Sequence, residues 1–248
     1  MQEFYIMDDH IRLHAKLEMP EGKEKCPLVI VFHGLTGHME EEHIVAVSKG
    51  MNTIGFATLR VELYGHGQSG GPFKDHTMFK WISNAMTIID YAKTLDFVTD
   101  IYLCGHSQGG LLVMLAAGMR ADDIKALIPM SPALVIPDGA RKGGMLGMTF
   151  DPNHIPDVLS LGPHTISGNY FRCAQLIHVE DSIRKYPKPV LLIHGDKDEA
   201  VPLQYSIDAS GQYENCRLVV VPDDNHCYDF HTDIVVRAIQ DFLTETDR

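Results

Sequence analysis

A chain of 248 residues can bury a large core, and an α/β fold of this length commonly forms one domain with an insertion. Its 21 Lys and Arg against 33 Asp and Glu give a formal net charge of −12, which disfavours nucleic acid and anionic lipid as partners and favours a small, neutral or weakly charged ligand. The five cysteines are odd in number, widely spaced and without a C-x-x-C pair, which argues against a disulfide framework and a zinc site.

The N-terminal twenty residues alternate charged and apolar side chains and lack the continuous apolar stretch of a signal peptide. No later segment reaches the roughly 18 consecutive apolar residues that span a bilayer. We therefore expect a soluble, cytoplasmic protein that does not enter a membrane. The composition does not decide the oligomeric state, so a homodimer stays open.

Apolar residues predict an N-terminal antiparallel hairpin followed by a mostly parallel sheet. After a short strand at 4–6 and an Asp-Asp turn, they recur at every second position from 11 to 17, which is typical of an edge hairpin with one buried face. Later, short apolar runs bounded by Gly, Pro or Asp suit strands that are buried on both faces. These runs cover residues 27–34, 56–63, 100–105, 125–132, 189–195 and 217–226.

Helical patterns alternate with these strands. They cover roughly residues 41–52, 77–95, 108–119, 203–213 and 232–245. Such alternation predicts right-handed crossovers, with helices on both faces of a doubly wound α/β sheet.

The interval 133–185 breaks this alternation, since it is rich in Pro, Gly, His and Met and carries no clear strand. A structureless loop of this length is improbable inside a compact domain, so we predict a small inserted cap above the sheet. The core would then comprise residues 1–132 and 186–248. A flexible linker is the alternative.

The segment Gly105-His106-Ser107-Gln108-Gly109 matches G-x-S-x-G and lies between a predicted strand and a predicted helix. In this motif a sharp turn forces the serine into a strained conformation, and side chains in place of the two glycines would collide with backbone. The turn exposes the hydroxyl beside the N–H groups at the helix N-terminus. The alternative, an ordinary N-cap serine, does not explain the symmetric glycine pair.

A serine nucleophile needs a histidine base and a carboxylate that orients it. Asp198 follows the predicted strand 189–195, and His226 follows the end of the last predicted strand, within the run 217–226, so we predict a triad of Ser107, Asp198 and His226. The remaining alternatives are Asp196, Asp223 or Asp224 as the acid and His231 or His106 as the base.

The segment His33-Gly34-Leu35-Thr36-Gly37 follows the first buried strand, where half of an oxyanion hole is expected. We predict that the backbone N–H groups of Leu35 and Gln108 bind the oxyanion. An ordinary turn would serve this sequence equally well.

The segment 65–70, Gly-His-Gly-Gln-Ser-Gly, formally matches the dinucleotide motif G-x-G-x-x-G, but the residues after it open no helix, so we predict no nucleotide site. No set of three or four His and Cys residues has zinc spacing. We expect neither a metal nor a cofactor.

With these motifs in order, the chain resembles the α/β-hydrolase superfamily over nearly its whole length. It is more closely similar to bacterial cinnamoyl (feruloyl) esterases, in HGLTGH, LYGHGQS, CGHSQGG, FDPNHIPD, GNYFR and HCYD. The resemblance implies an α/β-hydrolase fold with a cap that forms an aromatic pocket. By analogy, Asp138 and Tyr170 would face the phenol ring. His33 and His106 join the expected substrate-binding set, although His106 also suits a position beneath the nucleophile.

The resemblance implies a serine esterase that cleaves feruloyl, caffeoyl or coumaroyl esters, which are small aromatic substrates. Ser107 would attack the ester, His226 would transfer the proton, and water would release the acid from an acyl-enzyme. Related chains often carry Phe at the position of Leu35, so the preference among hydroxycinnamates stays open. The alternatives are a general short-chain acyl or monoacylglycerol esterase and a non-catalytic binding protein on the same fold.

Overall fold

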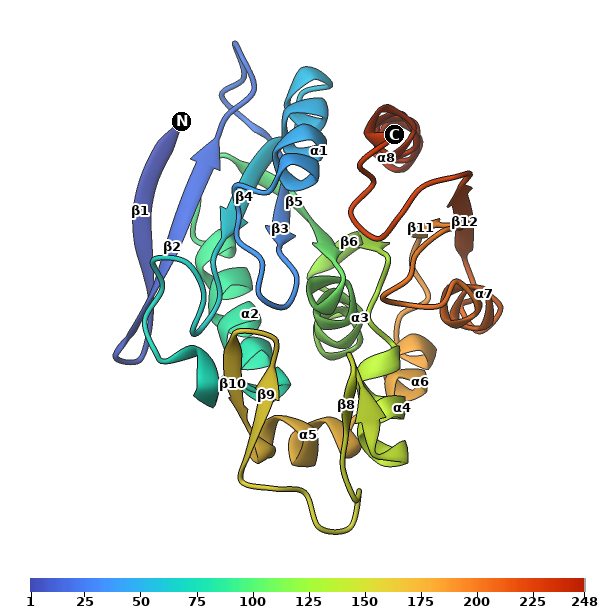
Figure 1. The fold of residues 1–248 in the computed structure, drawn as a ribbon. Coiled ribbons are helices and arrows are strands. Elements are labelled where there is room, and N and C mark those ends of the chain that lie inside the picture. Colours follow the sequence, from blue (N-terminus) through green and yellow to red (C-terminus); the bar gives the residue numbers. More distant parts are fainter. Residues whose placement is uncertain (248) are drawn as a thin grey trace.

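An eight-stranded sheet forms the centre of the molecule, and the computed structural model describes residues 1–247 (Figure 1). The strand order across the sheet is β1 (Gln2–Asp8), β2 (Ile11–Glu18), β4 (Ala57–Val61), β3 (Cys26–Phe32), β5 (Val98–His106), β6 (Ile124–Met130), β11 (Val190–Gly195) and β12 (Cys216–Val221). The pairs β1–β2 and β2–β4 are antiparallel, and all other neighbours are parallel. The predicted mostly parallel sheet with an N-terminal edge hairpin is therefore confirmed.

Helices cover both faces of the sheet, because its central strands are apolar on both sides. In β3, Val29 and Val31 pack into one cluster, whereas Leu28, Ile30 and Phe32 pack into the other. The first cluster includes side chains of α1 (Glu42–Thr53) and α8 (Thr232–Thr246); the second includes side chains of α2 (Met78–Lys93), α3 (Gln108–Met119) and α7 (Gln204–Ser210). Within residues 1–247, no helix is both long and apolar enough to cross a membrane.

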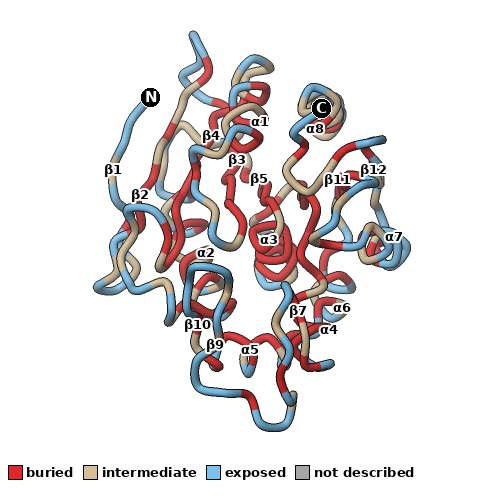
Figure 2. Tube along the Cα trace, viewed as in Figure 1, coloured by how far each residue is buried: buried red, intermediate tan, exposed pale blue. Residues whose placement is uncertain are grey.

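Helix α3 is the most enclosed of these helices, and Figure 2 shows it buried along almost its whole length. Its sequence, QGGLLVMLAAGM, is apolar on every side, which suits a helix surrounded by protein. It packs against β5 and β6 of the sheet and against α2 and α6 (Val179–Arg184) on its other sides. The start of this helix is therefore held by packing on several sides.

The last strand differs from its prediction in length and burial. The run 217–226 suggested a strand that is buried on both faces and ends before His226; β12 ends at Val221, which is its only buried residue. Pro222 has no N–H to continue the ladder, and β12 is the edge of the sheet, so one side has no neighbouring strand. The remaining residues, 222–226, form a loop.

The interval 133–185 is ordered and contains strands, so our expectation of no clear strand there was wrong. Its elements are α4 (Val135–Lys142), β7 (Gly144–Met145), β8 (Met148–Thr149), β9 (Val158–Leu161), β10 (His164–Ser167), α5 (Gly168–Gln175) and α6. The strands pair as two small antiparallel hairpins, β7–β8 and β9–β10. Each strand has at most four residues, which is too short for alternation to stand out in the sequence.

The segment 65–70 forms a turn, and a short 3-10 helix, η1 (Phe73–Asp75), follows it. The Glu62 carboxylate accepts a hydrogen bond from the Gln68 N–H at 2.6 Å and lies where a Cβ on Gly67 would be. The prediction that no helix opens on the last glycine is confirmed.

Candidate active site

Ser107 stands in a strained turn between β5 and α3, with φ of 56° and ψ of −118°. The two glycines around it are required by close backbone contacts. A Cβ on Gly105 would lie 2.2 Å from the Gly109 oxygen, and a Cβ on Gly109 would lie 2.5 Å from the His33 oxygen. The predicted collisions are confirmed, and only glycine fits at either position.

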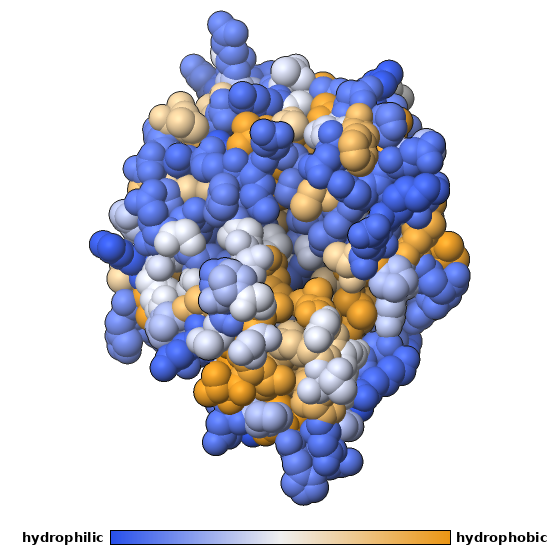
Figure 3. All heavy atoms as spheres, in the orientation of Figure 1, coloured by the Kyte–Doolittle hydropathy of each residue, from blue (hydrophilic) through white to orange (hydrophobic). Residues whose placement is uncertain are grey.

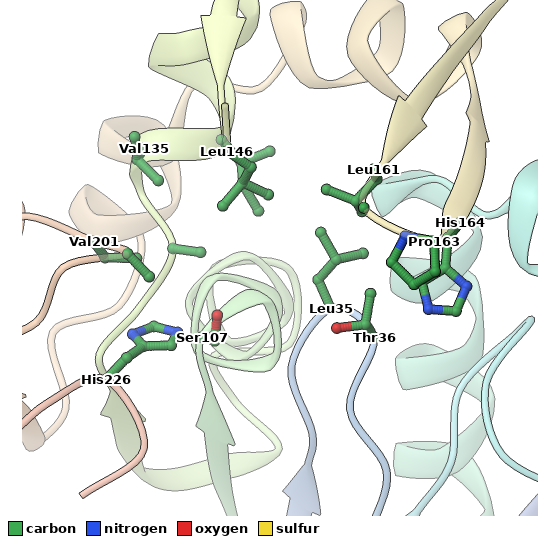
Figure 4. A pocket seen from close by; sticks show the side chains of 14 residues that line it. Leu35, Thr36, Ser107, Val135, Leu146, Leu161, Pro163, His164, Val201 and His226 are labelled. Carbon is green, nitrogen blue, oxygen red and sulfur yellow. The ribbon is translucent and has the colours of Figure 1, made fainter. Parts of the chain in front are cut away.

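The turn places the Ser107 side chain in a cavity of about 500 Å³. Its hydroxyl makes no hydrogen bond within residues 1–247, so it is free to meet a ligand. Figure 4 shows the imidazole of His226, which lines the same cavity, directed toward this hydroxyl.

His226 is oriented by Asp198, whose Oδ2 lies 2.6 Å from the His226 Nδ1. The two residues are 28 positions apart, on the loops that follow β11 and β12. Those strands are parallel neighbours with Gly195 opposite Val221, so both loops leave the same edge of the sheet. The Nδ1–H donates to the carboxylate, which leaves Nε2 to accept a proton from Ser107.

The Asp198 carboxylate is buried and fully engaged. Its Oδ1 accepts hydrogen bonds from the N–H groups of Ala200 and Val201, at 2.9 and 2.8 Å. Burial raises the pKa of Asp198, but hydrogen bonds from His194 and His226 outweigh burial and hold its pKa well below the usual range. The carboxylate is therefore ionised throughout the neutral range, and its charge would favour a positive charge on the imidazole of His226.

His194 is a member of the site that our sequence reasoning missed. Its Nε2 lies 2.9 Å from the Val201 oxygen and 3.1 Å from Asp198 Oδ2, and its Nδ1 lies 2.8 Å from the Ser206 hydroxyl. The side chain is completely buried. The sequence offered one signal for this residue: His194 is a polar side chain near the end of the otherwise apolar strand β11.

The alternative acids and bases have other partners. Asp196 accepts a hydrogen bond from the Asp223 N–H at 2.7 Å, while Asp224 is buried and accepts from backbone N–H groups, including that of His231 at 2.9 Å. His231 itself precedes helix α8. Among the candidates left open by the sequence, Asp198 is the acid that contacts His226.

The predicted oxyanion loop lies against the nucleophile. A Cβ on Gly34 would come within 3.0 Å of the Ser107 Cβ, which places the following Leu35 N–H beside the serine. Within the described chain, the N–H groups of Leu35 and Gln108 donate no hydrogen bond. Both N–H groups are therefore free to donate to an oxyanion. The Gln108 N–H also lies at the N-terminus of α3, where the helix dipole favours a negative charge.

His33 supports this loop and does not line the cavity, which corrects its assignment to substrate binding. It is completely buried, and its Nε2 accepts a hydrogen bond from the Leu63 N–H at 3.1 Å. Burial lowers the pKa of His33 to about 3, so the ring is neutral and can accept. His66, next to it, accepts from the Thr36 N–H at 3.2 Å.

His106 packs beneath the nucleophile and also does not line the cavity, so its assignment to substrate binding is corrected. Its Nε2 donates a hydrogen bond to the His226 carbonyl oxygen at 2.8 Å. Burial lowers the pKa of His106 well below the usual value, and the neighbouring His43 and His226 lower it further. The neutral imidazole of His106 therefore holds the loop that carries His226 through this hydrogen bond.

The cavity walls are mostly apolar and come from several distant segments. They include Leu35, Ala133, Val135, Ile136, Leu146, Leu161, Pro163, His164, Ala200 and Val201. Figure 4 shows Leu146 and Leu161 on the side of the cavity opposite His226 and Ser107. Figure 3 shows a hollow in this face, with hydrophobic residues gathered along its edge over the insert.

The insert residues expected at the phenol ring lie elsewhere. Asp138, on α4, contacts Lys142 at 2.8 Å and accepts a hydrogen bond from the Tyr205 hydroxyl; it lines a separate groove between α4 and α7. Tyr170, on α5, is buried and donates to Gln108 Oε1 at 2.7 Å. Neither lines the cavity, since their side chains meet Tyr205 and Gln108.

Comparison with known proteins identifies the family. A family model described as "Serine aminopeptidase, S33" matches residues 23–167, more than half of the chain and a segment that contains Ser107. The chain belongs to this family of α/β-hydrolases. It is therefore related to serine hydrolases in sequence as well as in fold.

The solved structures similar to this chain include Est1E from Butyrivibrio proteoclasticus with ferulic acid bound. It is 57% identical, with a TM-score of 0.97 over 98% of this chain and 99% of that one. The mouse α/β-hydrolase domain-containing protein 10 is 20% identical with a TM-score of 0.79, covers 99% of each chain, and supports the fold alone.

Curated relatives are more distant. The human mitochondrial palmitoyl-protein thioesterase ABHD10 is 26% identical over 200 residues, which cover 76% of this chain. The chain spans 62% of the length of that relative.

Proposed function

We propose that this protein is a serine carboxylic-ester hydrolase that cleaves hydroxycinnamate esters, such as those of ferulate, through an acyl-enzyme. The observation that carries the proposal is the single cavity lined by Ser107 and His226, with Asp198 hydrogen-bonded to the far side of the imidazole. The similarity to Est1E, whose solved structure holds ferulic acid, supports the choice of acyl group.

In the proposed reaction, Ser107 Oγ attacks the ester carbonyl while His226 Nε2 takes its proton. The N–H groups of Leu35 and Gln108 bind the resulting oxyanion, and each such donor typically lowers the barrier by about 2.7–4 kcal/mol. The imidazolium then protonates the leaving alcohol. Water, deprotonated by the same histidine, attacks the acyl-enzyme and releases the carboxylic acid.

The cavity suits an apolar acyl group. Leu35, Leu146 and Leu161 line the cavity with aliphatic surface, against which a cinnamoyl ring can pack (Figure 4). All three residues of the proposed triad come from one chain, so the reaction needs no second copy. A role for 133–185 as a cap that encloses the acyl group, and a cytoplasmic location, are parts of the same proposal.

Hydrolysis of methyl ferulate, methyl butyrate and an aminoacyl arylamide by the purified protein tests the proposal. We expect the highest kcat/KM for methyl ferulate. A preference for methyl butyrate would instead make the protein a general short-chain esterase, and cleavage of the arylamide alone would make it an aminopeptidase. Ser107→Ala must abolish each activity, and a serine-reactive phosphonate must add mass to the parent but not to this variant.

A further inference from the structure

A buried hydrogen bond joins the insert to the first residue of α3. The Tyr170 hydroxyl, on α5, donates to Gln108 Oε1 at 2.7 Å, across 62 positions of sequence. Both side chains are buried, Tyr170 at 1% exposed and Gln108 completely. Neither side chain lines the cavity, so this bond lies behind the reacting groups.

Gln108 is a position where small displacements matter for the proposed reaction. Its N–H belongs to the first turn of α3, where no preceding helical carbonyl holds it. The nearby helical bond, from the Leu111 N–H to the Ser107 oxygen at 3.0 Å, fixes the serine and leaves the Gln108 N–H unrestrained. The amide side chain of Gln108 is therefore a means of holding this residue in place.

Tyr170 is a rigid anchor for that amide. Its ring lies 5.0 Å from the ring of His76 and 5.1 Å from that of Phe171. Burial raises the pKa of Tyr170, so its hydroxyl remains protonated and remains a donor. Gln108 also keeps an amide nitrogen that is buried without a partner among the described residues, which is costly for folding. The bond from Tyr170 therefore satisfies the one polar atom of this buried amide that has a partner within residues 1–247.

We propose that Tyr170 is a positioning residue for the oxyanion hole: its hydroxyl holds the Gln108 side chain and so directs the Gln108 N–H toward the developing negative charge. The inference rests on the proposed function. It assigns Tyr170 an action on the transition state of any ester, and it excludes contact with the phenol ring of a hydroxycinnamate.

Tyr170→Phe separates these roles, because it retains the ring and removes the donor. We expect kcat/KM to fall by about tenfold for methyl ferulate and by the same factor for methyl acetate, which has no ring, with the loss in kcat and KM unchanged. Binding of a trifluoromethyl ketone, whose adduct with Ser107 carries an oxyanion, should weaken by a similar factor.

The matched control is Tyr186→Phe, which removes a buried hydroxyl that lies 3.4 Å from a backbone oxygen of Ile124 and makes no hydrogen bond to Gln108. It should leave both esters unaffected. Gln108→Met removes the same hydrogen bond from its other end, so the test does not depend on Tyr170→Phe folding. Adding Tyr170→Phe to Gln108→Met should cause no further loss, since the bond is already gone.

Three results would overturn the inference while the parent remains an active esterase. A loss confined to methyl ferulate would mean that Tyr170 contacts the substrate. A lower melting temperature with unchanged kcat would mean that it only packs. Additive losses in the double variant would mean that the two residues act separately. A parent that hydrolyses no ester would instead remove the proposed function itself, and the inference with it.

Discussion

The imidazole of His106 donates a hydrogen bond to the backbone carbonyl of His226 at 2.8 Å, although 120 positions separate the two residues. The strand that leads to Ser107 thereby also holds the loop that carries His226. The two rings lie 4.7 Å apart, and the ring of His43 lies 4.2 Å from His106 on another side. The neutral His106 thus fixes where the His226 imidazole stands.

Replacing His106 should reduce turnover without altering substrate affinity. His106→Phe keeps a ring against His43 but cannot donate to His226, so we expect kcat to fall by about tenfold, as loss of about 1.4 kcal/mol of positioning would give. KM should not change, because His106 does not line the cavity. Steady-state kinetics with methyl ferulate measure both values. An unchanged kcat would show that His226 is held by other contacts.

The two aspartates after β11 provide a matched pair of variants. Asp198→Asn should lower kcat by roughly 10⁴, because an amide can leave the His226 imidazole in the wrong tautomer. Asp196→Asn should retain most of the activity, since Asp196 accepts its hydrogen bond from the Asp223 backbone. Comparable losses in the two variants would contradict the assignment of Asp198 as the acid.

Gly109→Ala should prevent the tight turn at the nucleophile. Its Cβ would lie 2.5 Å from the His33 oxygen and 2.6 Å from the Phe32 oxygen, and backbone cannot move aside cheaply. We expect the free energy of unfolding to fall by about 3 kcal/mol, with loss of activity. The measurement is urea denaturation.

Gly211→Ala is the control for this substitution. Gly211 has φ of −72°, and the nearest atom to its added Cβ is 3.8 Å away, so alanine should be neutral or stabilise by about 0.4–1 kcal/mol. If Gly109→Ala were equally tolerated, the steric account of the turn would be wrong.

Buried neutral histidines should make the protein less stable as the pH falls below about 6.5. Burial lowers the pKa of His43 to about 4, and the neighbouring His226 is the second cause of this lowering. Between pH 6.5 and 4 the unfolded chain binds a proton at this residue and the folded chain does not, so acid favours unfolding.

His43→Phe removes this titration, and neither ring nitrogen of His43 forms a hydrogen bond within residues 1–247. The dependence of unfolding free energy on pH should become shallower by up to about 1.4 kcal/mol per pH unit in that window. Denaturation at pH 7, 6, 5 and 4.5 measures the slope. Parallel curves for parent and variant would contradict the prediction.

Much of the fold followed from local pattern. Short apolar runs and intervening helical periods located the strands and helices of the core, because a parallel sheet buried on both faces requires such runs. The insert was harder to predict. Its β9–β10 hairpin pairs four residues on each side, which gives too little alternation to recognise. Asp138 and Tyr170 do not line the cavity, because packing directs their side chains to Tyr205 and Gln108, which no local pattern specifies.

By itself, the sequence determined the nucleophile turn, since two glycines around a serine, between an apolar strand and an apolar helix, act through steric contacts with adjacent backbone. Tertiary structure decided which aspartate meets His226, because that contact depends on the parallel register of β11 and β12. It also brought His106 against the loop of His226 and Tyr170 against Gln108. Contacts between residues 62 and 120 positions apart arise from the way the chain crosses over the sheet, which no local pattern specifies.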